Sequence, residues 1–112
     1  NVAGAYHSRL MQSACEVFSN YLHGIEFLKP ELRVYTNVTG EMVEEPAEIK
    51  AALVKQVVST VRFEECLRNA SQACGVDRYF ECGPARVLAG LARRTDKTLT
   101  VKSVSEYDDL NA

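Results

Sequence analysis

Apolar residues recur at helical spacing near the start of the chain. The positions that form this pattern are Leu10, Met11, Ala14, Val17, Phe18, Tyr21 and Leu22. Residues three and four positions apart line one side of a helix, so the pattern predicts a helix with one buried face. Ser8 stands where an N-terminal cap is expected, and Gly24 stands where the helix should end.

Three further helices follow from the same kind of pattern. Pro46 opens the second helix, because proline fits the first helical turn, and its apolar face carries Ile49, Leu53 and Val57. The third helix ends at Gly75, and its apolar positions are Phe63, Cys66, Leu67, Ala70 and Cys74. The fourth helix starts at Gly83-Pro84, and its apolar positions are Val87, Leu88, Leu91 and Ala92.

Residues typical of β-strands separate these helices. Strands are predicted over 33–38, 77–82 and 99–104, and residues 1–3 match the tail of an earlier strand. Strands that alternate with helices predict an α/β fold, with a parallel sheet covered by helices on both faces. Reactive groups gather at the carboxyl ends of such strands, which makes the loop after residues 1–3 a candidate site.

Composition limits the size of the fold and the kinds of partner. With 112 residues and 46% hydrophobic content, we expect residues 1–112 to form one domain or part of one. The 13 basic and 15 acidic residues give no charge excess that would attract nucleic acid or a membrane surface. No apolar run approaches the roughly 20 residues of a membrane span, so a cytoplasmic or organelle-matrix protein is expected.

The cysteines and histidines do not match a metal site. Cys15, Cys66, Cys74 and Cys82 show no C-x-x-C spacing, and the two histidines lie far apart in the sequence. Metal binding is therefore not expected. Cysteines placed among apolar positions are typical of buried thiols in a reducing compartment.

His7 is the residue with the clearest chemical potential. It lies in the run Gly4-Ala5-Tyr6-His7-Ser8, directly before the first predicted helix. The positive end of a helix disfavours imidazolium, so a histidine there tends to stay neutral and is suited to act as a general base. The residues alone leave a second interpretation open, namely a surface histidine that precedes a capping serine.

A base needs a nucleophile, and the sequence offers none that is convincing. There is no G-x-S-x-G turn, and the other serines lie in helices, in a helix connection or in the last strand and tail. Cys74 and Cys82 each precede a glycine, but nothing in the sequence brings either near His7. The acidic pairs, such as Glu64-Glu65, match solvated charge better than paired catalytic carboxylates.

Four segments, in order, resemble one enzyme family. They are GAYHS at 4–8, YTNVTG at 35–40, KQVVSTVRF at 55–63 and YFECGP at 79–84. Together they are similar to motifs of the bacterial and organellar malonyl-CoA:acyl carrier protein transacylases, and more distantly to acyltransferase domains of polyketide and fatty-acid synthases. The resemblance implies the C-terminal portion of an α/β-hydrolase-like large subdomain, without the family's ferredoxin-like small subdomain.

The resemblance also implies roles for two residues. His7 would be the catalytic base, and the main-chain carbonyl of Gln56 would orient its ring. The implied reaction passes malonyl from malonyl-CoA to a serine and then to the pantetheine thiol of acyl carrier protein, with no metal or redox cofactor. The family's serine, oxyanion-hole glutamine and malonyl-binding arginine lie upstream, so we expect an isolated chain to be inactive without the missing N-terminal half.

Several positions depart from the family pattern. Thr60 replaces a proline, Phe63 a tryptophan and Ala85 a glycine, while Arg9 replaces a small residue or proline beside the histidine. Arg9 lies two residues from His7, so we expect it to contact phosphates of CoA or pantetheine. Two alternatives stay open: an acyltransferase domain of a polyketide synthase, and a noncatalytic α/β module that binds a partner through an apolar surface.

Overall fold

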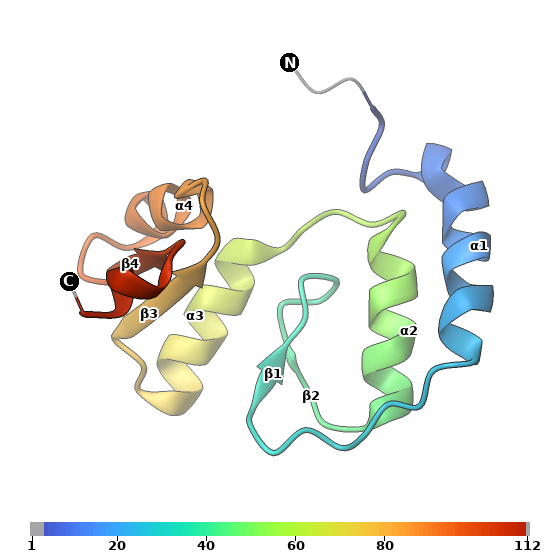
Figure 1. Cartoon of the computed structure of the whole chain (residues 1–112), viewed down its shortest axis with the longest axis horizontal. Coiled ribbons are helices and arrows are strands. Elements are labelled where there is room, and N and C mark those ends of the chain that lie inside the picture. Colours follow the sequence, from blue (N-terminus) through green and yellow to red (C-terminus); the bar gives the residue numbers. More distant parts are fainter. Residues whose placement is uncertain (1–3, 112) are drawn as a thin grey trace. The chain divides into compact units, whose positions relative to one another are not determined.

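The computed structural model describes residues 4–111, so the predicted strand tail at residues 1–3 lies outside the described residues (Figure 1). Its contacts divide the chain into two compact units. The N-terminal unit runs to Cys66 and the C-terminal unit begins at Leu67. The boundary falls within one helix, α3, which spans Phe63–Cys74.

The N-terminal unit is built on two helices. A short 3₁₀ turn, η1 (Arg9–Met11), leads into α1 (Gln12–His23), and α2 spans Pro46–Gln56. The predicted C-cap is confirmed, because Gly24 caps the end of α1. The predicted N-cap serves the preceding turn instead: the Ser8 hydroxyl oxygen accepts from the Leu10 N–H at 3.4 Å and caps η1, whereas the N-cap position of α1 is Met11. Cys15 and Leu22 are buried where α1 packs on α2, and the Cys15 thiol donates to the Val54 carbonyl at 3.2 Å.

The strand predicted over 33–38 is wrong in length and in pairing. Only β1 (Val34–Tyr35) is extended, and it pairs antiparallel with β2 (Met42–Val43), a strand that the sequence pattern did not predict. The segment between them closes on itself, because the Thr36 N–H donates to Glu41 O at 3.2 Å and the Gly40 N–H donates to Thr36 O at 2.9 Å. These main-chain groups are used within the turn and cannot extend a parallel sheet.

Gly40 allows this hairpin to approach the start of α3. Its φ of +77° lies in the left-handed region that favours glycine. A Cβ built at this position would lie 2.5 Å from the Glu65 Cβ and 3.2 Å from the Cys66 nitrogen. The family-like turn at residues 36–40 therefore fits against α3 only when it carries glycine at position 40.

The C-terminal unit confirms the parallel pairing that the sequence predicts. Strands β3 (Arg78–Cys82) and β4 (Thr100–Val104) pair in parallel, with Arg78 opposite Thr100 and Cys82 opposite Val104. Helix α4 (Val87–Thr95) connects them, and the 3₁₀ turn η2 (Tyr107–Asn111) follows. The chain is thus a mixed helix and strand protein with a parallel sheet. A larger sheet with helices on both faces stays a prediction.

Helix α4 begins later than predicted. Gly83 has φ +142° and Arg86 has φ +52°, so the backbone from Gly83 to Arg86 departs from helical geometry. The Gly83 N–H donates to Val104 O at 2.9 Å, and the Ser105 hydroxyl donates to Gly83 O at 3.0 Å. The expected start at Gly83-Pro84 is therefore wrong, because Gly83 is tied to the end of β4.

Glu81 joins β3 to the N-terminus of α4. Its buried carboxylate accepts from the Leu88 N–H at 2.9 Å, the Ala89 N–H at 3.0 Å and the Ser103 hydroxyl at 3.0 Å. Burial alone would raise the pKa of Glu81, but these hydrogen bonds outweigh burial and hold its pKa below the ordinary value. The carboxylate therefore caps α4 in its charged form.

This cap predicts an acid-dependent loss of stability. A lowered pKa in the folded chain means that Glu81 stabilises the fold above its ordinary pKa and loses this effect as the pH falls through the lowered value. We expect Glu81→Gln to melt about 5 °C below the original chain at neutral pH. The difference in melting temperature between the two proteins should become smaller as the pH is lowered. Circular dichroism melts across a pH series measure this difference.

The control is Glu26→Gln, which removes the same charge from an exposed loop residue. It should leave the melting temperature nearly unchanged at every pH. If the difference in melting temperature between Glu81→Gln and the original chain stays constant down to acid pH, the capping role is contradicted.

Candidate active site

His7 is held in an unusual backbone conformation at the entrance to η1. Its φ of +59° lies in the left-handed region, which is uncommon for residues other than glycine. Such conformations persist where surrounding contacts enforce them. In this chain the contact is a hydrogen bond from the imidazole to another part of the N-terminal unit: His7 Nδ1 lies 2.9 Å from the main-chain oxygen of Gln56.

This contact selects one form of the neutral imidazole. A carbonyl oxygen only accepts hydrogen bonds, so the hydrogen lies on His7 Nδ1. Nε2 then keeps its lone pair and is the atom that can accept a proton. The side chain is exposed, so this nitrogen is accessible from outside the chain. The site can therefore perform general base chemistry at Nε2 of His7.

Gln56 presents its carbonyl because it is the last residue of α2. Carbonyls in the last turn of a helix lack partners within the helix. The Gln56 oxygen accepts from the Ser59 N–H at 3.2 Å as well as from His7. The Gln56 side chain closes the same turn, because Nε2 donates to Ser59 O at 2.9 Å and to Thr60 O at 3.3 Å.

This second role of Gln56 was not predicted from the sequence. The resemblance named only its main-chain carbonyl, and no residue pattern marks the Ser59 and Thr60 carbonyls as partners of its amide. The Gln56 side-chain oxygen is buried and has no hydrogen-bond partner among residues 4–111. The main chain of Gln56 thus contacts His7, while its side chain stabilises the turn that follows α2.

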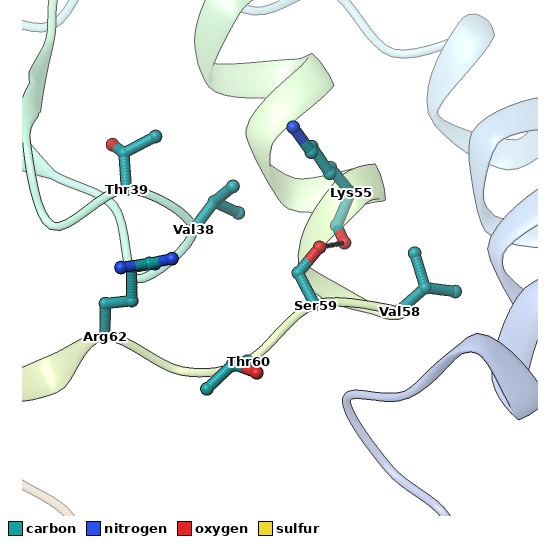
Figure 2. Close-up of a pocket in the computed structure, with 7 residues that line it drawn as sticks. All are labelled: Val38, Thr39, Lys55, Val58, Ser59, Thr60 and Arg62. Atoms are coloured by element: carbon teal, nitrogen blue, oxygen red, sulfur yellow. Dashed lines mark hydrogen bonds between the residues drawn. The ribbon is translucent and has the colours of Figure 1, made fainter.

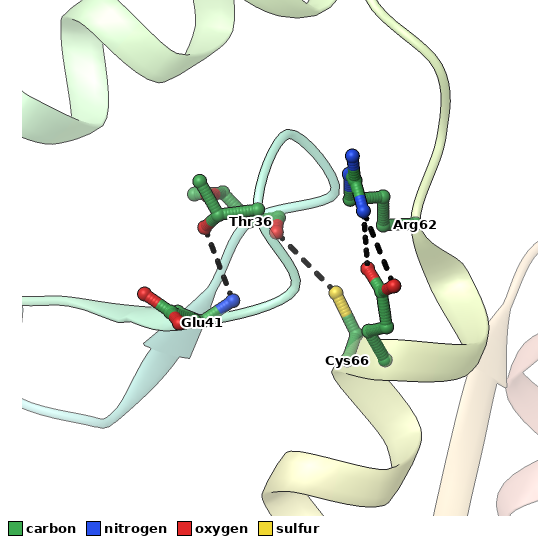
Figure 3. A network of polar contacts seen from close by, with 6 residues as sticks. Thr36, Glu41, Arg62 and Cys66 are labelled. Atoms are coloured by element: carbon green, nitrogen blue, oxygen red, sulfur yellow. Dashed lines mark hydrogen bonds and ion pairs between the residues drawn. The ribbon is translucent and has the colours of Figure 1, made fainter.

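The chain after α2 is held against the hairpin at two places, the main chain of Arg62 in the linker and the thiol of Cys66 in α3; Figure 3 shows the second contact. The main-chain N–H of Arg62 donates to the main-chain oxygen of Asn37 at 2.8 Å. The Cys66 thiol lies 3.4 Å from both the main-chain oxygen of Thr36 and the side-chain oxygen of Asn37. Burial raises the pKa of Cys66, and the charge of Glu65 raises it further. The thiol therefore stays protonated and donates, which suits a structural contact rather than a nucleophile.

The other candidate residues add no second catalytic group beside His7. The Ser8 hydroxyl donates to the Ala5 carbonyl, so its hydrogen is already engaged. Cys74 and Cys82 belong to the C-terminal unit. Arg9 is exposed in η1, and its expected contact with phosphates stays a prediction. The catalytic roles of His7 and Gln56 likewise stay predictions, although the hydrogen bond between them is present.

Two further observations concern the described part of the chain. No three side chains of His, Cys, Asp or Glu within residues 4–111 are grouped as they would be around a metal ion, and no disulfide joins the described cysteines. Among the described helices, none has the length and apolar character needed to cross a bilayer.

Comparison with known proteins gives a consistent result. A malonyl CoA-acyl carrier protein transacylase of Bacillus subtilis is 36% identical over 97% of this chain. The crystal structure of the Synechocystis malonyl-CoA:ACP transacylase superposes with a TM-score of 0.90 over 99% of the chain and 38% of that protein, at 32% identity. No family model matches the chain.

A second similar structure contains a partner. It is a malonyl-transacylase in complex with a type II polyketide synthase acyl-carrier protein, with a TM-score of 0.87 and 33% identity over 98% of this chain and 35% of that chain. The chain spans about a third of the length of the curated relatives that it matches, with 34% of the Bacillus protein covered.

The proteins that resemble the chain in these comparisons belong to one class, the malonyl transacylases. Over nearly its whole length the chain matches a C-terminal fragment of malonyl-CoA:acyl carrier protein transacylases. The resemblance seen in the four sequence motifs is thereby confirmed.

The His7–Gln56 contact predicts one tautomer of His7. In the neutral ring the hydrogen should lie on Nδ1, because that atom faces a carbonyl oxygen. Long-range ¹⁵N–¹H correlation of the labelled chain above the pH range of histidine titration measures this directly. His23, which is exposed in the last turn of α1, provides the internal reference. A hydrogen found on Nε2 of His7 would contradict this orientation of the ring.

Proposed function

We propose that the chain is the base-bearing part of a malonyl-CoA:acyl carrier protein transacylase of fatty-acid synthesis. The observation that carries this proposal is the 2.9 Å contact between His7 Nδ1 and the Gln56 carbonyl. It joins two sequence motifs 49 residues apart and leaves Nε2 as the basic atom. The names of the matching relatives support the same reaction.

The proposed reaction has two acyl transfers that share one base. A serine from the upstream part of the enzyme attacks the thioester carbonyl of malonyl-CoA, and its proton passes to Nε2 of His7. The oxygen–carbon bond forms, the carbon–sulfur bond breaks, and the proton returns to the sulfur of CoA. The pantetheine thiol of acyl carrier protein then attacks the malonyl-serine ester, gives its proton to His7, and restores the serine hydroxyl.

A carbonyl is sufficient to orient His7 in this scheme. It holds Nδ1–H while Nε2 accepts a proton, and it stays a hydrogen-bond acceptor when the ring becomes imidazolium. No triad carboxylate is then required. The transfers need no metal or redox cofactor, since each step moves only a proton and an acyl group.

The remaining parts of the proposal concern the whole enzyme. Residues 1–112 would be one partial domain, the C-terminal portion of an α/β-hydrolase-like large subdomain, with the nucleophile and the ferredoxin-like small subdomain upstream. Coverage of about a third of the relatives supports this. The missing N-terminal half is then a required partner, and the isolated chain should be inactive. Location in the cytoplasm or an organelle matrix stays a prediction.

The acyl acceptor has two candidate settings. The matched transacylase in complex with a polyketide synthase carrier protein supports acyl carrier protein as the acceptor and does not distinguish fatty-acid from polyketide synthesis. A comparison of transfer rates to carrier proteins of both kinds by the complete polypeptide would identify the preferred one.

Replacement of His7 tests the proposed base. In the complete polypeptide that contains this sequence, His7→Ala should lower kcat for malonyl transfer by about 10² to 10⁴-fold, because the attacking serine loses its proton acceptor. Transfer of radiolabelled malonyl from CoA to acyl carrier protein measures this. The matched control is His23→Ala, which should keep the original rate. Unchanged turnover in His7→Ala would refute the assignment.

Arg9 is the proposed contact for a phosphate of CoA or pantetheine. Its exposed guanidinium lies two residues from His7. Arg9→Ala should raise the KM for malonyl-CoA about five- to tenfold at low salt, and the difference should shrink as salt screens the contact. Arg9→Lys retains the charge and should show a smaller effect. Equal KM values of Arg9→Ala and the original enzyme at every salt concentration would exclude the contact.

A further inference from the structure

A polar cleft lies beside the turn that positions Gln56 (Figure 2). It has a volume of about 530 Å³ and lies within the N-terminal unit. The hairpin turn, the end of α2 and the linker to α3 form its walls, and its lining residues are Val38, Thr39, Lys55, Val58, Ser59, Thr60 and Arg62. Nothing in the catalytic proposal uses this cleft.

The charged side chains of the cleft are both cations. Figure 2 shows Lys55 on α2 and Arg62 on the linker on opposite sides of the opening. Arg62 Nη1 also contacts the two carboxylate oxygens of Glu65 at 3.2 and 3.3 Å. This pair uses one end of a guanidinium that has five N–H donors, so Arg62 retains donors for a ligand. Including Glu65, the three side chains carry one net positive charge.

Hydroxyl groups supply the remaining polar lining. The Thr39 oxygen accepts from the Glu41 N–H at 3.2 Å, which leaves its own hydrogen to donate. The Ser59 hydroxyl donates to the Lys55 carbonyl at 2.7 Å and so links two lining residues. Thr60 is the third hydroxyl of the cleft. Two cations and the Thr39 hydroxyl, with no carboxylate in the lining, form a surface that favours an anion with several acceptor oxygens.

The cleft is also connected to the proposed base. The Gln56 amide donates to the carbonyls of Ser59 and Thr60, two residues that line the cleft, while the Gln56 carbonyl accepts from His7. An anion held between Lys55 and Arg62 would therefore lie beside the same turn that orients the imidazole.

We propose that this cleft binds a phosphate or pyrophosphate group through Lys55 and Arg62. Its size exceeds a single phosphate and leaves room for a phosphate joined to a further group. Assignment of that group to the thioester carrier, either free CoA or the phosphopantetheine of acyl carrier protein, rests on the proposed function. The binding of a phosphate or pyrophosphate group in the cleft is independent of the proposed function.

Titration of the ¹⁵N-labelled chain with sodium pyrophosphate tests the site directly. We expect saturable shifts of the Thr39, Ser59 and Thr60 amides, and weaker binding as the ionic strength rises. Shifts that do not saturate, or that appear at other basic residues and not in the cleft, would overturn the proposal.

Two charge-removing variants identify the anchors. Lys55→Gln and Arg62→Gln should each raise the Kd for pyrophosphate about tenfold, because each removes a charged donor. Lys29→Gln removes an exposed charge from the same unit, outside the cleft, and should leave the Kd nearly unchanged. The amide spectrum of each variant shows that it is folded. Equal Kd values for Lys55→Gln and Lys29→Gln would overturn the role of Lys55. Equal Kd values for Arg62→Gln and Lys29→Gln would overturn the role of Arg62.

Kinetics of the complete polypeptide identify the source of the phosphate. If Lys55→Gln raises the KM for malonyl-CoA alone, the group belongs to CoA. If it raises the KM for acyl carrier protein alone, the group belongs to phosphopantetheine. No change in either KM overturns the assignment to the carrier. A complete polypeptide that transfers no malonyl would refute the proposed function, whereas the pyrophosphate titration would still decide the cleft.

Discussion

The hydrogen bond between His7 and the main-chain oxygen of Gln56 is the contact on which the candidate site depends. Without it, His7 would be a surface residue in a strained backbone conformation with both ring tautomers available. With it, one nitrogen is fixed as donor and the other is left as base. The contact also links the entrance of η1 to the end of α2, so the position of the proposed base depends on the position of the helix end.

The surroundings of Gln56 stabilise this geometry in successive layers. Its own amide closes the turn over Ser59 and Thr60, and the linker beyond them is tied to the hairpin through Arg62 and Asn37. Gly40 lets the hairpin pack against the start of α3. A change at Gly40 would therefore act on the site through the linker, far from the histidine in sequence.

The sequence allowed the helices to be predicted well, because their apolar positions repeat over several turns. It was less informative where main-chain hydrogen bonds decide the structure. The strand predicted over 33–38 became a two-residue strand in a hairpin, since Thr36 and Gly40 bond within the turn. The late start of α4 depends on Gly83 and Arg86, whose positive φ angles leave no pattern in the sequence. Four short motifs indicated the family and the pairing of His7 with Gln56, yet no motif indicated the Gln56 amide contacts or the cleft.

The atoms that align the site belong largely to the peptide backbone. The Gln56 oxygen, the Asn37 oxygen and the Arg62 nitrogen are present whatever side chains these positions carry. Alanine scanning would leave all three atoms in place, and at position 62 only proline would remove the donor. Substitutions in the lining of the neighbouring cleft can therefore change its chemistry while the main-chain contacts keep the histidine aligned. In such a framework, the residues that would recognise a ligand can vary independently of the atoms that hold the proposed base.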